Sequence, residues 1–206
     1  SNMTTTLVPA AVMACFGTAG AAEDITVDVA VIGAGGAGLS AAVQAHELGA
    51  NVVVVEKMAM VGGNTVRAAG GLNAVGTALQ QAKGTKDSVE IMFYDTMKGG
   101  HWLNDPALVR TLVTQSASSV YWLLAHGGDL RDVGLMAGAS QPRTPRPTGG
   151  ALVGPELVRT LYTAAKNLKI DVRTNTHAEQ ILTDKSGRVV GLKVKGKDGT
   201  YTIHSK

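Results

Sequence analysis

The sequence predicts an α/β fold built on a parallel sheet, with a small antiparallel β-meander near its C-terminal end. Residues 27–56 carry two short apolar runs with a glycine-rich turn and an amphipathic helical pattern between them. Helical and strand patterns then alternate as far as residue 173, as in α/β domains. From residue 178 onward three short strand patterns are separated by turn residues, which favours a meander.

The stretch VDVAVIGAGGAGLSAAVQAHELGANVVVVE, residues 27–56, predicts a complete βαβ unit. Residues 27–32 form the continuous apolar run of a strand that is covered on both faces. Residues 39–48 have helical spacing, with Gly49 as a C-cap, and residues 52–55 are a second, all-valine strand. Two strands joined by a helix are expected to lie parallel in one sheet.

The turn of this unit has the G-x-G-x-x-G spacing of nucleotide-binding folds, at Gly33, Gly35 and Gly38. The first glycine permits a tight turn, the second lets backbone approach a pyrophosphate, and the third lets helix pack closely on strand. The phosphates would sit at the positive N-terminus of the helix. The predicted binding residues here are Gly33, Gly35, Gly36, Ala37 and Gly38.

Glu56 ends the second strand, at the position where such folds hold the ribose of an adenosine. A carboxylate there accepts hydrogen bonds from ribose hydroxyls and repels a 2′-phosphate. The alternative is an ordinary βα turn, which glycines alone would not exclude in a chain with 26 of them. Strand, glycines, helix, strand and acid in register favour the nucleotide site.

Composition bounds the remaining possibilities. The 206 residues suffice for one sizeable domain, alone or with an appendage, and 45% hydrophobic with 17% charged residues is typical of a globular chain. A net charge of +3 is too small to indicate nucleic-acid binding. The single cysteine, Cys15, excludes a disulfide framework and a CxxCH haem attachment site in these residues, and the five dispersed histidines predict no metal site.

The first 24 residues are expected to lie outside the fold. Ser1 and Asn2 precede Met3 as a tag-cleavage scar would, and residues 7–22 form an apolar run with small residues at its end, as in a secretory signal. No basic residue precedes that run. Its length is below the roughly 20 residues of a spanning helix, so we expect no stable membrane insertion. The likeness to a secretory signal predicts a periplasmic location.

A second glycine-rich passage, EKMAMVGGNTVRAAGGLNA at residues 56–74, has almost no helical or strand period. Backbone with so few side chains indicates close approach of another group. We interpret it as a ligand wall, because it directly follows Glu56; the alternative is a flexible surface loop.

The rest of the chain predicts helices at 88–98, 106–126 and 155–168, a third parallel strand at 170–173, and meander strands at 178–183, 188–195 and 200–204. Asp105 is the expected N-cap of the second helix, with Pro106 at its first position. Residues 134–150 are expected to be irregular. Within them, Arg143 and Arg146 either meet phosphate or carboxylate groups or are structural.

Four passages resemble the flavoprotein subunit of the fumarate reductase and succinate dehydrogenase family: EKMAMVGGNTVRAAGGLNA, DTMKGGHWLNDPALV, DVGLMAGAS and RPTGGALVG. The soluble periplasmic branch, with flavocytochrome c fumarate reductases and urocanate reductases, is the most similar. The resemblance covers residues 25–206 and implies that they are the N-terminal part of a Rossmann-like FAD-binding domain. The cofactor implied is FAD rather than NAD.

The resemblance also assigns residues. Glu56, followed by Lys57, would hold the adenosine ribose, and the backbone of Ala178 would touch the adenine. Gly70 and Met136 would border the substrate. The flavin ring would lie along Asn64, Thr65, Ala69, Gly70 and Gly71. Membrane-bound members carry a histidine bonded covalently to the flavin where this chain has Asn64, so non-covalent FAD is expected.

The implied activity is reduction of the C=C bond of a small unsaturated carboxylate of the fumarate or urocanate type, with electrons from a donor protein or haem domain outside these residues. The family's catalytic arginine and capping domain have no counterpart here, so no catalytic residue is expected and the isolated chain should be inactive. Two alternatives remain: a non-catalytic FAD-binding fragment, and a related flavin dehydrogenase such as a 3-oxosteroid dehydrogenase or aspartate oxidase.

Overall fold

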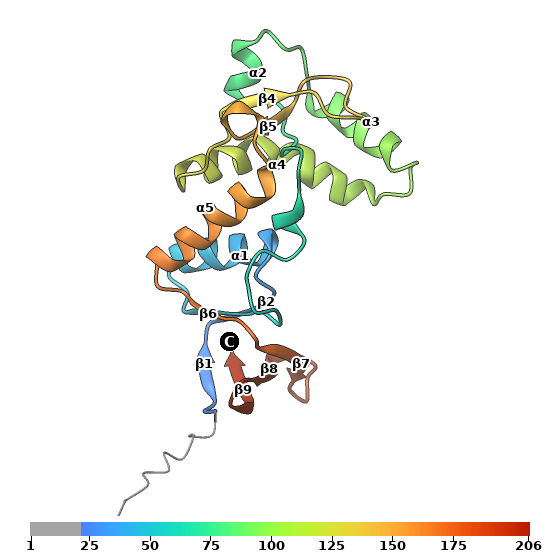
Figure 1. Ribbon diagram of the computed structural model, residues 1–206. Helices are drawn as coiled ribbons and strands as arrows, with labels where there is room; N and C mark the ends of the chain where they lie inside the picture. The colour runs from blue at the N-terminus through green and yellow to red at the C-terminus, as the bar shows by residue number, and fades with distance from the viewer. Residues whose placement is uncertain (1–21) are drawn as a thin grey trace, which may run out of the picture.

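The computed structural model describes residues 22–206, so the predicted scar and nearly all of the secretory-like segment lie outside the described residues. The chain forms a four-stranded sheet and a three-stranded sheet. In Figure 1 the first lies at one end, the second lies next to it, and helices are stacked beyond. A further group of helices and two short strands lies at the far end from the four-stranded sheet.

The three-stranded sheet is the parallel sheet that the sequence predicts. It contains β2 (Val29–Ile32), β3 (Val52–Val55) and β6 (Asp171–Arg173), parallel and in the order β2-β3-β6. The valines of β3 are all buried and alternate between the two faces. Val52 and Val54 join the core on the helical side, and Val53 and Val55 join the core under the meander. β3 is therefore covered on both faces.

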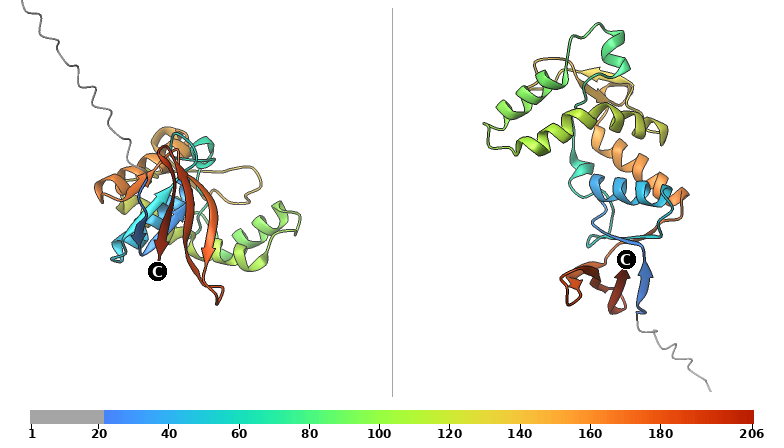
Figure 2. Two further views of the ribbon diagram at one scale, coloured as in Figure 1. Left: turned by 90° about the horizontal axis from the view of Figure 1, so that it is seen from below. Right: turned by 180° about the vertical axis from the view of Figure 1, so that it is seen from behind.

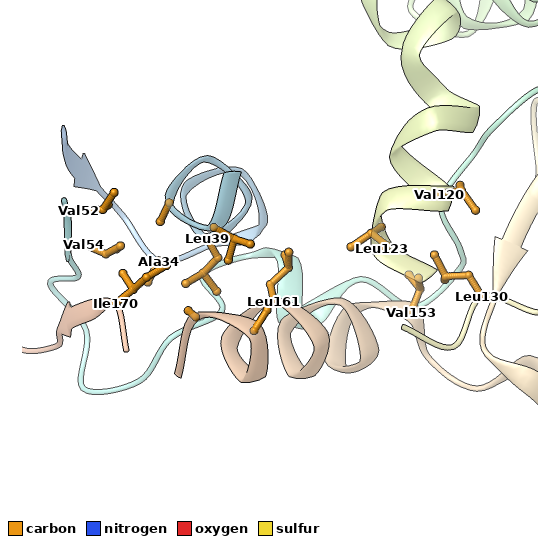
Figure 3. Close-up of a cluster of buried hydrophobic side chains, with 14 of the residues drawn as sticks. Ala34, Leu39, Val52, Val54, Val120, Leu123, Leu130, Val153, Leu161 and Ile170 are labelled. Atoms are coloured by element: carbon orange, nitrogen blue, oxygen red, sulfur yellow. The ribbon is translucent and has the colours of Figure 1, made fainter. Parts of the chain in front are cut away.

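Two helices cover one face of this sheet: α1 (Gly36–Glu47) and α5 (Val153–Asn167). Leu39 of α1, Leu161 of α5 and Ile170 just before β6 are buried in one cluster with two of the β3 valines, Val52 and Val54 (Figure 3). The same cluster continues into the C-terminal half of α4 (Pro106–Ala125). The predicted Asp105 cap is confirmed, since its carboxylate accepts the first amides of α4.

The other face is covered by the meander of β7 (His177–Thr183), β8 (Val189–Gly196) and β9 (Gly199–Ser205). A short strand, β1 (Ile25–Val27), extends this sheet by pairing in parallel with β9 (Figure 2). The prediction of one strand over 27–32 was therefore wrong, because the chain changes sheets at residue 28. The Asp28 amide donates to Asn51 O and its carboxylate accepts the Asn51 amide, which fixes the bend.

The far end was predicted less completely. It holds α3 (Val89–Gly99), which packs on α4, together with elements that the sequence did not indicate: α2 (Ala78–Ala82), the hairpin of β4 (Asp132–Gly134) and β5 (Thr144–Arg146), and the turn η2 (Thr148–Gly150). A further turn that the sequence did not indicate, η1 (Thr65–Arg67), lies beside the start of α1. Residues 134–150 are thus only partly irregular. No helix in residues 22–206 is both long and apolar enough to cross a membrane.

Candidate cofactor site

The glycine turn has the geometry that its spacing predicts. Gly33 directly follows β2 and has a φ of 97°, which an L-side chain rarely adopts. A Cβ on Gly38 would overlap the carbonyl oxygen of Gly33, so only glycine lets α1 pack back onto the turn. The first intrahelical bond runs from the Leu39 amide to Gly35 O at 2.9 Å. The amides of Ala37 and Gly38 precede that bond, at the positive end of α1 where an anion is stabilised.

Glu56 lies beside this turn, at the C-terminal end of β3, and only 6% of it is exposed. Its Oε2 accepts the Ala34 amide at 2.9 Å and its Oε1 accepts the Met58 amide at 2.9 Å. Within residues 22–206 no cationic side chain pairs with it. A carboxylate has about four acceptor positions, so the two amides leave about two of them unused.

The second glycine-rich passage folds directly over the first. The Gly62 amide donates to Ala34 O at 2.8 Å, and Thr65 Oγ1 accepts the Gly36 amide at 3.0 Å. A Cβ on Gly63 would lie 3.6 Å from the Cα of Gly35. The two passages therefore form one continuous backbone surface, which favours the ligand-wall interpretation over a flexible loop.

Farther along, the passage meets the β4–β5 region. A Cβ on Gly70 would lie 2.5 Å from Cε of Met136, so the two residues assigned to the substrate are in contact. A Cβ on Gly71 would overlap the side chain of Thr144 and come within 2.6 Å of Pro145 O. A side chain at Gly71 is excluded by backbone, whereas a side chain at Gly70 would have to displace the flexible end of Met136.

The adenine end of the predicted site is tied to Glu56 through backbone. The Thr176 amide donates to Glu56 O at 2.9 Å, and the Asn175 amide donates to Met58 O at 2.9 Å. Ala178 follows at the start of β7 and is half-buried. Lys57 is exposed directly after Glu56.

The candidate residues thus follow one line through the molecule, from β7 past the glycine turn to the β4–β5 hairpin (Figure 1). Asn64 and Ala69 are exposed along this line, and Thr65 is half-buried. β7, which carries Ala178, and the β4–β5 hairpin, which meets Gly71, lie toward opposite ends of this line (Figure 1). Such a line suits an extended ligand with a nucleotide at one end and a ring at the other.

The sequence did not single out Ala34 or a cleft beside α1. Ala34 is fully buried and uses both its amide and its carbonyl to join the glycine turn to Glu56 and Gly62. The cleft has a volume of about 820 Å³ and is lined by Gly36, Ala37, Ser40, Leu72, Trp122 and Leu123, among others. Gly36 and Ala37, which the sequence assigns to the cofactor, line part of this cleft, but Trp122 and Leu123 come from α4, which is distant in sequence, so the sequence did not indicate the cleft itself.

The two arginines of residues 134–150 have different surroundings. Arg143 is buried and paired with aspartates, so the structural interpretation holds for it. Arg146 Nε lies 3.4 Å from Asp132 Oδ2 across the hairpin. In the described part of the chain no group of three or more His, Cys, Asp or Glu residues could hold a metal ion.

Several known proteins are similar to this chain in sequence. The family model described as an FAD binding domain matches residues 28–206. The chain is 53% identical over 171 residues to "Fumarate reductase (cytochrome)" of Shewanella frigidimarina, covering 83% of this chain and 30% of that protein. It is 38% identical over 170 residues to "Urocanate reductase" of Eggerthella lenta, covering 81% of this chain and 28% of that protein.

The fold matches a solved structure described as the open conformation of a flavocytochrome c3 fumarate reductase. The TM-score is 0.86 at 45% identity, and the match covers 88% of this chain and 32% of that one. The chain therefore spans about a third of the length of these relatives. The predicted parallel sheet with an antiparallel meander is confirmed, as is the resemblance to this group of flavoproteins. The chain belongs to the FAD-binding domain family.

Proposed function

We propose that these residues bind FAD within a flavin-dependent oxidoreductase that reduces the C=C bond of a small unsaturated carboxylate, of the fumarate or urocanate type. The observation that carries the proposal is Glu56, a buried carboxylate with unused acceptor positions beside the open N-terminus of α1. Identity to a fumarate reductase over most of this chain supports the reaction class.

Each part of the line has one task in this proposal. The backbone at 33–38 leaves room for a pyrophosphate, and Glu56 orients the ribose by accepting its hydroxyls. Gly70 and Gly71 present backbone to the flavin ring, and Met136 gives the substrate an apolar neighbour. Bound FAD supplies hydride transfer at its N5 atom. These residues bind and orient; none of them donates the substrate proton.

Two titratable side chains that could serve as an acid are occupied elsewhere. His126 is bonded to Glu47 and to the carbonyl of Trp122, and Asp105 caps α4. We therefore infer that the proton donor lies outside these 206 residues. The chain alone should not reduce fumarate or urocanate with a reduced dye faster than free FAD does. Turnover above the free-flavin rate would contradict this inference.

The direct test is titration of the chain with FAD, ADP and NADP⁺. FAD and ADP should bind, because both carry the adenosine and pyrophosphate that Glu56 and the glycine turn accept. NADP⁺ should not compete, because its 2′-phosphate meets the Glu56 carboxylate. Absence of FAD binding, or equal binding of NADP⁺, would refute the proposed cofactor site.

We further propose that the FAD is held without a covalent bond. Asn64, the N-cap residue of η1, has an amide side chain that forms hydrogen bonds and is no nucleophile. Acid precipitation of the flavin-loaded protein should release all flavin into the supernatant. Flavin retained in the pellet would contradict the assignment.

The location and electron source are proposed from sequence. The apolar run at residues 7–22 supports export to the periplasm, and the lack of a CxxCH motif supports an electron donor or haem domain outside this chain. Fractionation of cells that make the full gene product would test the location. Recovery of the protein only with the cytoplasm would refute export.

A further inference from the structure

Arg143 is the largest of the fully buried side chains in the described residues, with 1% of it exposed. Its Nε and Nη2 donate to the two carboxylate oxygens of Asp87, each at 2.9 Å. Its Nη1 lies 2.9 Å from Oδ2 of Asp95. One planar guanidinium therefore holds two carboxylates from different segments: Asp87 lies between α2 and α3, and Asp95 lies within α3.

Both carboxylates are tied to further groups. Asp87 Oδ2 accepts the side-chain amide of Gln80 at 2.9 Å, and Asp95 Oδ2 accepts the amide of Ser140 at 2.9 Å and its hydroxyl at 2.7 Å. Burial raises the pKa of Asp95, but the bonds from Ser140 and Arg143 outweigh it and lower the pKa overall. Asp95 thus stays ionised and fixes the loop that follows Met136.

The backbone next to this cluster positions Gly70 and Gly71, which we call the glycine wall. The Ala74 amide donates to Arg143 O at 2.8 Å, and the Leu72 amide donates to Pro145 O at 2.8 Å. The hydroxyl of Thr144 donates to Asn73 Oδ1 at 2.7 Å between them. Residues 72–74 therefore align with residues 143–145. This alignment sets Gly71 against Thr144.

We propose that Arg143 is a positioning residue for the flavin and substrate wall: it acts through residues 136–145 to set where Gly70, Gly71 and Met136 lie. The inference rests on the proposed function and adds a determinant of how tightly the ring half of the cofactor is held. A lysine has one compact charge and cannot hold both aspartates in a planar fork. The adenosine half lies at Glu56, on the other side of the glycine turn, and does not depend on Arg143.

The test compares FAD with ADP as probes of the 206-residue chain. Arg143→Lys should weaken FAD binding by about tenfold or more, as expected for loss of buried charged hydrogen bonds, while ADP affinity changes less than about twofold. Asp95→Asn should act in the same direction with a smaller effect, since it leaves the Arg143–Asp87 pair intact. The control is Arg159→Lys, which alters a more exposed arginine that joins Glu156 to Gly127 O and bonds neither Asp87 nor Asp95.

Amide hydrogen exchange adds a readout that needs no flavin. In Arg143→Lys the amides of Leu72 and Ala74 should exchange about tenfold faster or more, while those of Leu192 and Val194 in the meander keep their wild-type rates. Uniform acceleration of exchange over the whole chain would mean that Arg143 contributes only to the overall stability of the fold, and it would overturn the proposal. Equal loss of FAD and ADP affinity, or unchanged FAD affinity, would also overturn it.

Failure of the proposed function gives a different result. If the wild-type chain binds FAD no more tightly than ADP, the cofactor assignment fails, and with it the flavin role of Arg143. In that case Leu72 and Ala74 still report whether Arg143 sets the wall. The two failures are therefore distinguishable.

Discussion

The two glycine-rich segments, 33–38 and 62–71, look alike in sequence but need glycine for different reasons. In the first, the group that excludes a side chain at Gly38 is the carbonyl of Gly33, within the same turn. In the second, Gly70 meets Met136 and Gly71 meets Thr144, which are far away in sequence. A motif can therefore reveal the first segment, whereas the second acquires its meaning only when distant segments pack on it.

The largest effect is expected from Gly38→Ala. The new Cβ would overlap backbone that cannot rotate away, so the free energy of unfolding should fall by about 3 kcal/mol or more. Urea denaturation measures this. Gly99→Ala is the control, because no atom lies within 4 Å of a Cβ there and alanine favours the end of α3. A stable Gly38→Ala chain would show that the turn can open, contrary to its local rigidity.

Glu56→Gln comes next. The amide keeps one acceptor oxygen but sets an NH₂ group against one of the two backbone amides, so unfolding free energy should fall by about 1–3 kcal/mol. ADP affinity should fall by a similar free energy, because ribose hydroxyls lose a charged acceptor. Calorimetry with ADP and urea denaturation check the two effects. Glu179→Gln, an exposed change in the meander, is the control, and equal ADP affinity in Glu56→Gln would refute the ribose assignment.

Gly70→Ala should cost less, about 1 kcal/mol, because its new Cβ meets the flexible end of Met136. A double-mutant cycle with Met136→Ala sharpens the comparison. Removing the Met136 side chain should relieve the clash, so the two changes should couple favourably. Strict additivity of the two unfolding free energies would mean that Met136 does not pack on Gly70.

The smallest effect concerns the contact that joins α1 to α4. Burial lowers the pKa of His126, but its bonds to the Trp122 carbonyl and the Glu47 carboxylate outweigh this and leave the pKa raised. Because the folded pKa is raised, the stabilisation is complete below the unfolded value of about 6.5 and is lost as pH rises through the folded pKa. The unfolding free energy of the wild type minus that of His126→Gln, measured by urea denaturation from about pH 5.5 to about pH 8.5, should therefore decrease as the pH rises. A difference that is constant or grows would contradict the protonated contact.

The sequence was most informative where contacts are local. The valines of β3, the glycine turn, the helix of α1 and the Asp105 cap of α4 each depend on residues within about one turn or one strand, and each was predicted correctly. The sequence did not predict the break between β1 and β2, because apolar residues continue on both sides of Asp28. The bend depends on the hydrogen bond with Asn51, which comes 23 residues later in the sequence, after α1.

What the sequence by itself determined is the βαβ unit and the position of Glu56 at its end, since periodicity and turn chemistry specify both. What only the tertiary structure decided is the region that packs on residues 70–74: α2, the β4–β5 hairpin and the burial of Arg143. Elements of three to five residues are too short to be stable alone, so their positions follow from long-range bonds such as Leu72 to Pro145. Those bonds form only when segments some 70 residues apart are brought together, and no local pattern in the sequence encodes them.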